Sequence, residues 1–179
     1  MIIFNDIARL LSKYGIKSFL PAFAIGRSQE ILLQYKKNKL SHIHVLGLAK
    51  EVCKYYNSRI NIDFFGAGTN SISDDSNIEN VIALNDIIIA SSGMLAENSC
   101  SSRCYHTLME GSWDAALIKT GYMEDKRNGG ILLDEWETSG KLLFDVSLSA
   151  HATYYELLTT INVLEPNKVI CIHGNGIEL

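Results

Sequence analysis

The amino-acid sequence predicts an α/β protein with a mainly parallel sheet and helices on both faces. Segments with strand and helix patterns alternate through most of the chain, as in βαβ units joined by right-handed crossovers. Asp86–Ser91 is a nearly continuous apolar run, which is typical of a strand buried on both faces. Two further strand-like runs end in His151 and His173, and the carboxyl edge of such a sheet is where binding groups collect.

The composition is that of an ordinary globular protein. Of the 179 residues, 47% are hydrophobic and 20% are charged, which suits a core of about one domain. The formal net charge of -4 argues against a surface that is basic throughout, but it leaves room for a local basic groove. The four cysteines form no C-x-x-C pair, and Asn5, Asp6 and Arg9 interrupt any secretory signal. We therefore expect a reduced, cytoplasmic protein without a membrane span.

The sequence of the first part of the chain predicts a helix, a strand and a second helix. Apolar residues recur at helical spacing over Ile3–Tyr14, and Gly15 ends this helix. Lys17–Phe23 predicts a short buried strand. Pro21 indicates the end of that strand or an irregularity, because proline cannot donate a ladder hydrogen bond. Gly26–Tyr35 predicts the second helix.

The middle of the chain predicts two more strands. His42–Leu46 is one, and a helix follows it from Gly47 through Tyr56. Residues 57–80 are polar and turn-rich, so we expect mostly loop there. Asp86–Ser91 is the other strand, and a turn follows at once.

A helix is predicted for Ser101–Met109, with Gly111 after it. Short strands are predicted at Ala115–Thr120 and Ile131–Leu133, and a longer one at Lys141–Leu148. These runs are apolar and are separated by charged or glycine-containing turns.

The end of the chain predicts a short βαβ-type piece. Thr153 and Glu156 have capping-box form at the start of a helix, and Pro166 stops that helix. Val169–Ile172 then predicts a strand. The helix has one apolar face, made of Tyr154, Leu157, Leu158, Ile161 and Leu164.

His151 and His173 are the first candidates for chemistry. An imidazole at a strand end can bind a metal or move protons, although a single histidine is more often structural. Ser91, Ser92 and Gly93 follow the most apolar strand, where hydroxyl and backbone N–H groups can hold a phosphate. A plain strand-to-helix turn is the alternative.

Two other groups fit metal sites poorly. His42 and His44 alternate along a strand, but no third ligand follows them. Cys100, Cys104 and His106 match no usual structural-zinc spacing, and one half-buried helix face explains the cysteines.

These motifs together resemble the β-CASP family of RNA-processing nucleases of metallo-β-lactamase fold. Pro21–Glu30, PAFAIGRSQE, closely resembles the family segment P-x-F-A-hydrophobic-G-R-x-Q-E. Four more segments match in family order: Ser91–Leu95 resembles the S-S/P-G-M-L loop, Thr120–Leu133 the G-Y…G-x-L-L segment, Ser149–Ala152 motif B, and His173–Gly174 motif C.

The resemblance implies a role for each site residue. The family's motif C histidine ligates one of two active-site zinc ions, which implies His173 as a metal ligand. The motif B histidine lies near the scissile phosphate, which implies His151 as a catalytic residue. The implied phosphate-binding residues are Ser91, Ser92, Gly93 and Arg27.

The chain also departs from the family. Its only H-x-H, at His42–His44, is not continued as H-x-H-x-D-H. Thr153 stands where aspartate is usual, and Asn175 stands where glutamate is usual. We therefore expect residues 1–148 to be a Rossmann-like β-CASP domain lacking its start. Residues 149–179 are expected to be a C-terminal fragment of the metallo-β-lactamase domain.

The predicted function is the β-CASP portion of a zinc-dependent hydrolase that cleaves RNA phosphodiester bonds, as a ribonuclease or in mRNA 3′-end processing. A catalytic zinc needs three protein ligands, so we expect the chain alone to be inactive. Single-stranded RNA is the expected partner, and an N-terminal lactamase half or a second copy would cover the C-terminal helix. The alternative is a non-catalytic module that binds nucleic acid or a partner. A small-molecule-binding Rossmann-like domain rests on fold analogy alone.

Overall fold

The computed structural model describes residues 2–40, 42–60, 62–65, 69–70, 77–84, 86–123, 127–146, 152 and 154–170. The chain divides into two compact units, Met1–Leu148 and Ser149–Leu179. Among the described residues, no helix is both long and apolar enough to cross a membrane.

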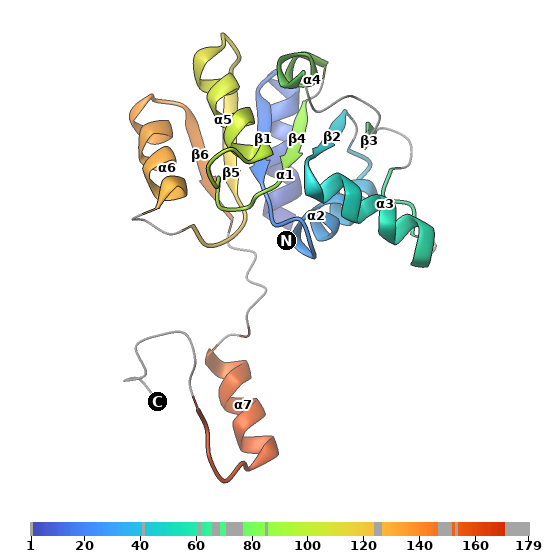
Figure 1. Ribbon diagram of the computed structural model, residues 1–179, viewed down its shortest axis with the longest axis vertical. Coiled ribbons are helices and arrows are strands. Elements are labelled where there is room, and N and C mark those ends of the chain that lie inside the picture. The colour runs from blue at the N-terminus through green and yellow to red at the C-terminus, as the bar shows by residue number, and fades with distance from the viewer. Residues whose placement is uncertain are drawn as a thin grey trace. The chain divides into compact units, whose positions relative to one another are not determined.

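A six-stranded sheet forms the centre of the first unit (Figure 1). Its strands are β1 (Lys17–Pro21), β2 (Ile43–Leu46), β3 (Thr69–Asn70), β4 (Ile87–Ala90), β5 (Ala115–Lys119) and β6 (Leu142–Asp145). They lie in the order β3-β2-β4-β1-β5-β6, and each neighbouring pair is parallel. Phe19 of β1 is level with Ile88 of β4 on one side and with Leu117 of β5 on the other. The predicted α/β class is confirmed.

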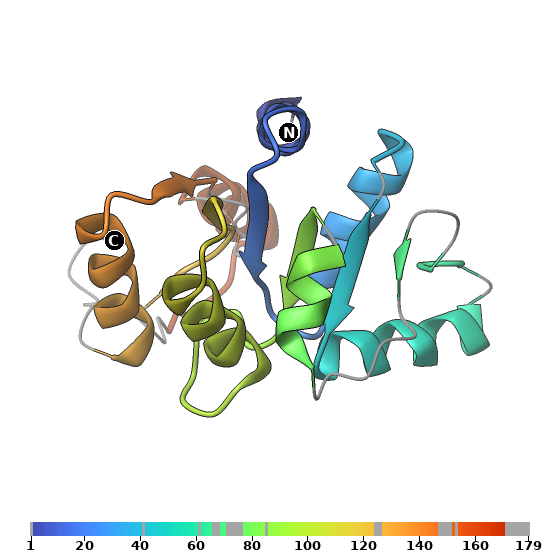
Figure 2. The same ribbon diagram turned by 90° about the horizontal axis from the view of Figure 1, so that it is seen from above.

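Helices cover both faces of this sheet. They are α1 (Ile2–Lys13), α2 (Arg27–Lys37), α3 (Leu48–Ile60), α4 (Ile78–Leu84), α5 (Cys100–Glu110) and α6 (Asn128–Thr138). One apolar core joins α1, α2 and α3 to the sheet, and a second core joins α4, α5 and α6 to it. Figure 2 shows α1 and α2 on the opposite side of the sheet from α5 and α6. In β4, Ile87 and Ile89 enter the first core, while Ile88 enters the second, as strand alternation requires.

Proline and glycine mark the ends of elements as the sequence predicts. Pro21 is the last residue of β1, a central strand in which proline would otherwise remove a ladder bond. Gly15 follows α1 with a φ of 70°, a conformation that glycine adopts without strain.

The strand predicted at Ile131–Leu133 is wrong. These residues lie in the helix α6, where Leu132 and Trp136 are buried four residues apart. Short apolar runs do not separate strand from helix, and the decisive partner, Trp136, lies beyond the run. The helix places this pair on one face, against the second core.

The loop expected over residues 57–80 is also wrong in part. Helix α3 extends to Ile60, β3 forms at Thr69–Asn70, and α4 begins at Ile78. Ile78, Val81 and Ile82 are buried at helical spacing against the second core. A helix of seven residues is too short to give a clear period in the sequence.

The described part of the second unit contains the helix α7 (Tyr154–Leu164), which ends two residues before Pro166. No residue of α7 is buried, and Tyr155, Val163 and Leu164 are each at least 70% exposed. Val169 and Ile170, the first half of the strand predicted at 169–172, are not in a strand; residues 171 and 172 lie outside the described residues.

Candidate functional site

The carboxyl ends of β4, β1 and β5 form the candidate site of the first unit. These strands are neighbours in the sheet, with β1 in the middle. After β1 the chain enters α2 on the face of the first core, whereas after β4 and β5 it enters α5 and α6 on the face of the second. Connections that leave adjacent strands toward opposite faces open a crevice at the sheet edge, which is the usual ligand site of parallel α/β sheets.

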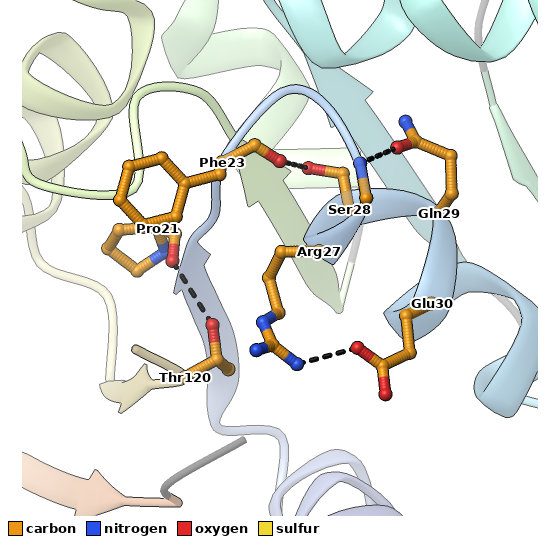
Figure 3. Close-up of polar contacts among 8 residues, drawn as sticks. Pro21, Phe23, Arg27, Ser28, Gln29, Glu30 and Thr120 are labelled. Carbon is orange, nitrogen blue, oxygen red and sulfur yellow. Dashed lines mark hydrogen bonds and ion pairs between the residues drawn. The ribbon is translucent and has the colours of Figure 1, made fainter. Parts of the chain in front are cut away.

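The segment after β1 is held by side chains of the first turn of α2 (Figure 3). The Gln29 side-chain oxygen accepts the Gly26 N–H at 2.7 Å, and its amide nitrogen donates to the Ala24 carbonyl at 3.0 Å. The Ser28 hydroxyl donates to the Phe23 carbonyl at 2.7 Å. The first bond pairs the N–H of Gly26, the residue before the helix, and the other two pair carbonyls of the loop between β1 and α2. The serine and glutamine of PAFAIGRSQE are therefore structural.

Arg27 lies buried beside Glu30. A guanidinium nitrogen of Arg27 is 2.6 Å from a carboxylate oxygen of Glu30, and the Arg27 side chain is 7% exposed, against 45% for Glu30. Figure 3 shows the two side chains pointing toward one another from the first turn of α2. The positive charge predicted to meet a phosphate is thus largely neutralised within the fold.

Ser91 joins the loop after β4 to the end of β2. Its hydroxyl accepts the Ala49 N–H at 3.3 Å and donates to the Leu46 carbonyl at 3.4 Å, and the residue is 7% exposed. A Cβ at Gly47 would lie 2.7 Å from the Ser91 hydroxyl oxygen, so only glycine leaves room for this contact. The Ser91 hydroxyl is therefore occupied within the fold.

Ser92 and Gly93 differ from Ser91 in the groups they leave available. The peptide bond between the two serines is cis. The Ser92 hydroxyl accepts the Ala96 N–H at 3.0 Å, and within the described chain no acceptor takes its hydroxyl hydrogen. The Gly93 N–H likewise has no acceptor in the described ranges. Both residues belong to the loop after β4, where Ser92 is half-buried and Gly93 is buried.

The segment after β5 lies against the other two. The Thr120 hydroxyl is 3.5 Å from the Pro21 carbonyl at the end of β1 (Figure 3). A Cβ at Gly121 would lie 3.9 Å from the Phe23 ring, and one at Gly129 would lie 2.4 Å from the Met94 carbonyl oxygen. The three motif segments therefore meet at one edge of the sheet. The sequence patterns do not single out Phe23 and Thr120 as site residues, although both lie within the motif segments.

Cys100, Cys104 and the paired histidines take no part in this edge. Cys100 and Cys104 are buried in the second core, and His106 is exposed. His44 is fully buried in β2, whereas His42 precedes the strand and is exposed. Among the residues that the structure describes, no group of three or more His, Cys, Asp or Glu side chains could hold a metal.

Cys53 lies in the first core and is a hydrogen-bond partner of Gln29. The Gln29 amide nitrogen lies 3.1 Å from the Cys53 sulfur. Burial raises the pKa of the Cys53 thiol, and the hydrogen bond from Gln29 lowers it by less. The thiol therefore stays protonated and unreactive at neutral pH.

His151 and His173 lie outside the described residues. Their predicted roles as catalytic residue and zinc ligand stay predictions. The described residues by themselves do not fit a zinc site, since they lack a set of three ligands.

Comparison with known proteins bears on the family. Residues 141–176 match the model of the Zn-dependent metallo-hydrolase RNA specificity domain. Over 98% of its length the chain is 23% identical to the cleavage and polyadenylation specificity factor subunit 3-I of Arabidopsis thaliana. The resemblance to the β-CASP family is confirmed. The chain spans 29% of the length of that relative.

Proposed function

We propose that this chain is the β-CASP portion of a zinc-dependent hydrolase that acts on RNA phosphodiester bonds. The observation that carries the proposal is the match of residues 141–176 to an RNA specificity domain of zinc-dependent metallo-hydrolases. The convergence of three motif segments at the carboxyl edge of the sheet supports it. In this proposal residues 1–148 form the β-CASP domain, and residues 149–179 belong to the metallo-β-lactamase domain. The chain's three described cysteines are buried thiols rather than disulfides, which suits the cytoplasm.

The chain's own contribution is to hold the RNA backbone. The Ser92 hydroxyl hydrogen has no acceptor in the described part of the chain, and it suits a phosphate oxygen. The Gly93 N–H also has no acceptor there, but Gly93 is buried. Ser91 positions that loop by its bonds to Ala49 and Leu46. Arg27 contributes less than Ser92, because Glu30 neutralises it and little of its side chain is exposed.

Zinc would supply the hydrolytic chemistry by polarising the phosphate and activating a water molecule. In the proposal His173 provides one of its ligands, and His151 lies near the scissile phosphate. A catalytic zinc takes three protein ligands, and the described residues contain no such group. The isolated chain is therefore expected to bind RNA without cleaving it.

Complementation tests this expectation. Mixing the chain with a metallo-β-lactamase half that carries H-x-H-x-D-H, with zinc, should give cleavage of single-stranded RNA that neither piece gives alone. The same mixture with His173→Ala is the control, and it should stay inactive if this residue is a ligand. Cleavage by the isolated chain, or equal activity of the His173→Ala mixture, would contradict the proposal.

Two serine-to-alanine variants test the phosphate contact. Ser92→Ala removes a donor to a charged group, so RNA binding should weaken by about 1.5 kcal/mol, roughly tenfold. Ser112→Ala is the matched control, because this exposed serine lies before β5, at the other edge of the sheet. Affinity is measured by fluorescence anisotropy over a salt series. Equal affinities of the two variants would remove Ser92 from the phosphate site.

A non-catalytic RNA-binding module is the second candidate. It is favoured by the lack of a three-ligand group in the ranges that the structure describes. Salt-dependent RNA binding together with failed complementation would support it.

A further inference from the structure

The Phe23 ring lies beside the loops that follow β4 and β5. It lies two residues beyond the end of β1, the strand between β4 and β5. The residue is 44% exposed, whereas its neighbour Ala22 is 1% exposed. A single exposed apolar side chain is common and says little by itself. The contacts of the ring make this one informative.

Two glycines from other loops lie near neighbouring atoms of the Phe23 ring. A Cβ at Gly93 would lie 3.1 Å from Cδ2, and a Cβ at Gly121 would lie 3.9 Å from Cε2, the adjacent ring atom. Gly93 comes from the loop after β4 and Gly121 from the loop after β5. Neither glycine carries a side chain that could cover the ring.

The backbone of Phe23 is held in place on both sides. Its carbonyl accepts the Ser28 N–H at 3.2 Å and the Ser28 hydroxyl at 2.7 Å. The preceding residue, Ala22, donates its N–H to the Ala90 carbonyl of β4 at 3.0 Å. A ring on a fixed backbone loses little conformational freedom when a ligand binds, which favours affinity.

We infer that the Phe23 ring is a stacking platform for an unpaired nucleobase. This rests on the proposed function, in which RNA lies at this edge. Ser92, whose hydroxyl is assigned to a phosphate, immediately precedes Gly93, where a Cβ would lie 3.1 Å from the ring. Stacking needs an exposed base face, so the ligand is single-stranded.

The net negative charge of the protein favours stacking, rather than long-range charge attraction, as a source of affinity for RNA. The chain carries a net charge of -4, so long-range attraction adds little to RNA binding. The nearest buried cation of the motif, Arg27, is paired with Glu30. An aromatic contact supplies affinity that does not depend on salt, unlike a phosphate contact.

The test measures how tightly the full chain and its variants bind intact and modified RNA. Phe23→Leu keeps apolar bulk but removes the aromatic face, and Phe23→Trp keeps a face. Ile25→Ala is the control, since Ile25 is 68% exposed in the same segment. The ligand is a short oligouridine, either intact or with one abasic residue placed at each position in turn.

The wild-type chain should bind about tenfold more weakly when one particular position is abasic. Phe23→Leu should bind the intact RNA about tenfold more weakly and lose its sensitivity to that position, whereas Phe23→Trp and Ile25→Ala should keep it. The slope of affinity against salt should be unchanged in Phe23→Leu.

Three outcomes would overturn the inference. Equal binding of all the abasic RNAs by the wild-type chain removes the stacked base, even if Phe23→Leu fails to fold. If Phe23→Leu still binds the RNA with that abasic position more weakly than the intact RNA, the stacked base contacts another residue. No RNA binding at low salt overturns the proposed function and this inference together, whereas the first two outcomes leave the proposed function intact.

Discussion

Replacing Trp136 by alanine is expected to lower the free energy of unfolding by about 3–5 kcal/mol. Trp136 is fully buried in α6 and lies against Phe19 of β1 and Tyr105 of α5, with ring centroids 6.4 and 5.5 Å away. Its indole N–H donates to the Leu142 carbonyl at 2.9 Å. Truncation would leave a cavity in the second core and remove this hydrogen bond. Since domains are stable by about 5–15 kcal/mol, this variant should be close to unfolding.

Urea unfolding followed by circular dichroism measures this change. Trp136→Phe is the matched control: it fills most of the volume and loses the hydrogen bond, so it should cost about 1–3 kcal/mol. The remaining tryptophan, Trp113, reports unfolding by fluorescence in both variants. A loss below about 1 kcal/mol in Trp136→Ala would contradict the packing of α6 described above.

Replacing Gly93 by alanine is expected to cost about 1–3 kcal/mol and to weaken RNA binding. A Cβ at this position would lie 2.7 Å from the Phe23 nitrogen and 3.0 Å from the Ala22 carbonyl carbon. These are backbone atoms, and the Ala22 N–H is bonded to β4. The clash therefore cannot be relieved by rotating a side chain, and the loop that carries Ser92 must move.

Gly121→Ala is the matched control for Gly93→Ala. Its nearest neighbour, the Phe23 ring, would be in ordinary contact at 3.9 Å, so its stability should change little. Urea midpoints and RNA affinity are measured for both variants. If Gly93→Ala is as stable as Gly121→Ala, the loop after β4 does not pack as closely against the end of β1 as described above.

Much of the first unit follows from local patterns in the sequence. The apolar run at Asp86–Ser91 predicts β4 because a strand buried on both faces needs no polar side. Pro21 and Gly15 predict ends of elements because their backbones restrict or extend the allowed angles. The order of strands and helices predicts a parallel sheet, and hence places the motif loops at its carboxyl edge.

The misassigned elements depend on distant partners. Ile131–Leu133 suits a strand locally, but burial of Leu132 together with Trp136 makes the segment helical. Helix α4 is too short for a periodic signal, and its apolar residues gain their burial against the second core. In both cases packing outweighs the weak local preference.

By itself, the sequence determined the α/β class, the position of the motif loops and the family resemblance, because these depend on residue order and local patterns. Only the tertiary structure separated Ser91, whose hydroxyl is bonded to β2 and α3, from Ser92, which keeps a free hydroxyl hydrogen in the described part of the chain. It also decided that Arg27 is buried and paired, and that Phe23 meets two glycines from other loops. The Arg27–Glu30 pair lies within one turn of α2, but the burial of Arg27 and the other contacts arise where distant segments meet, and residue order does not specify them.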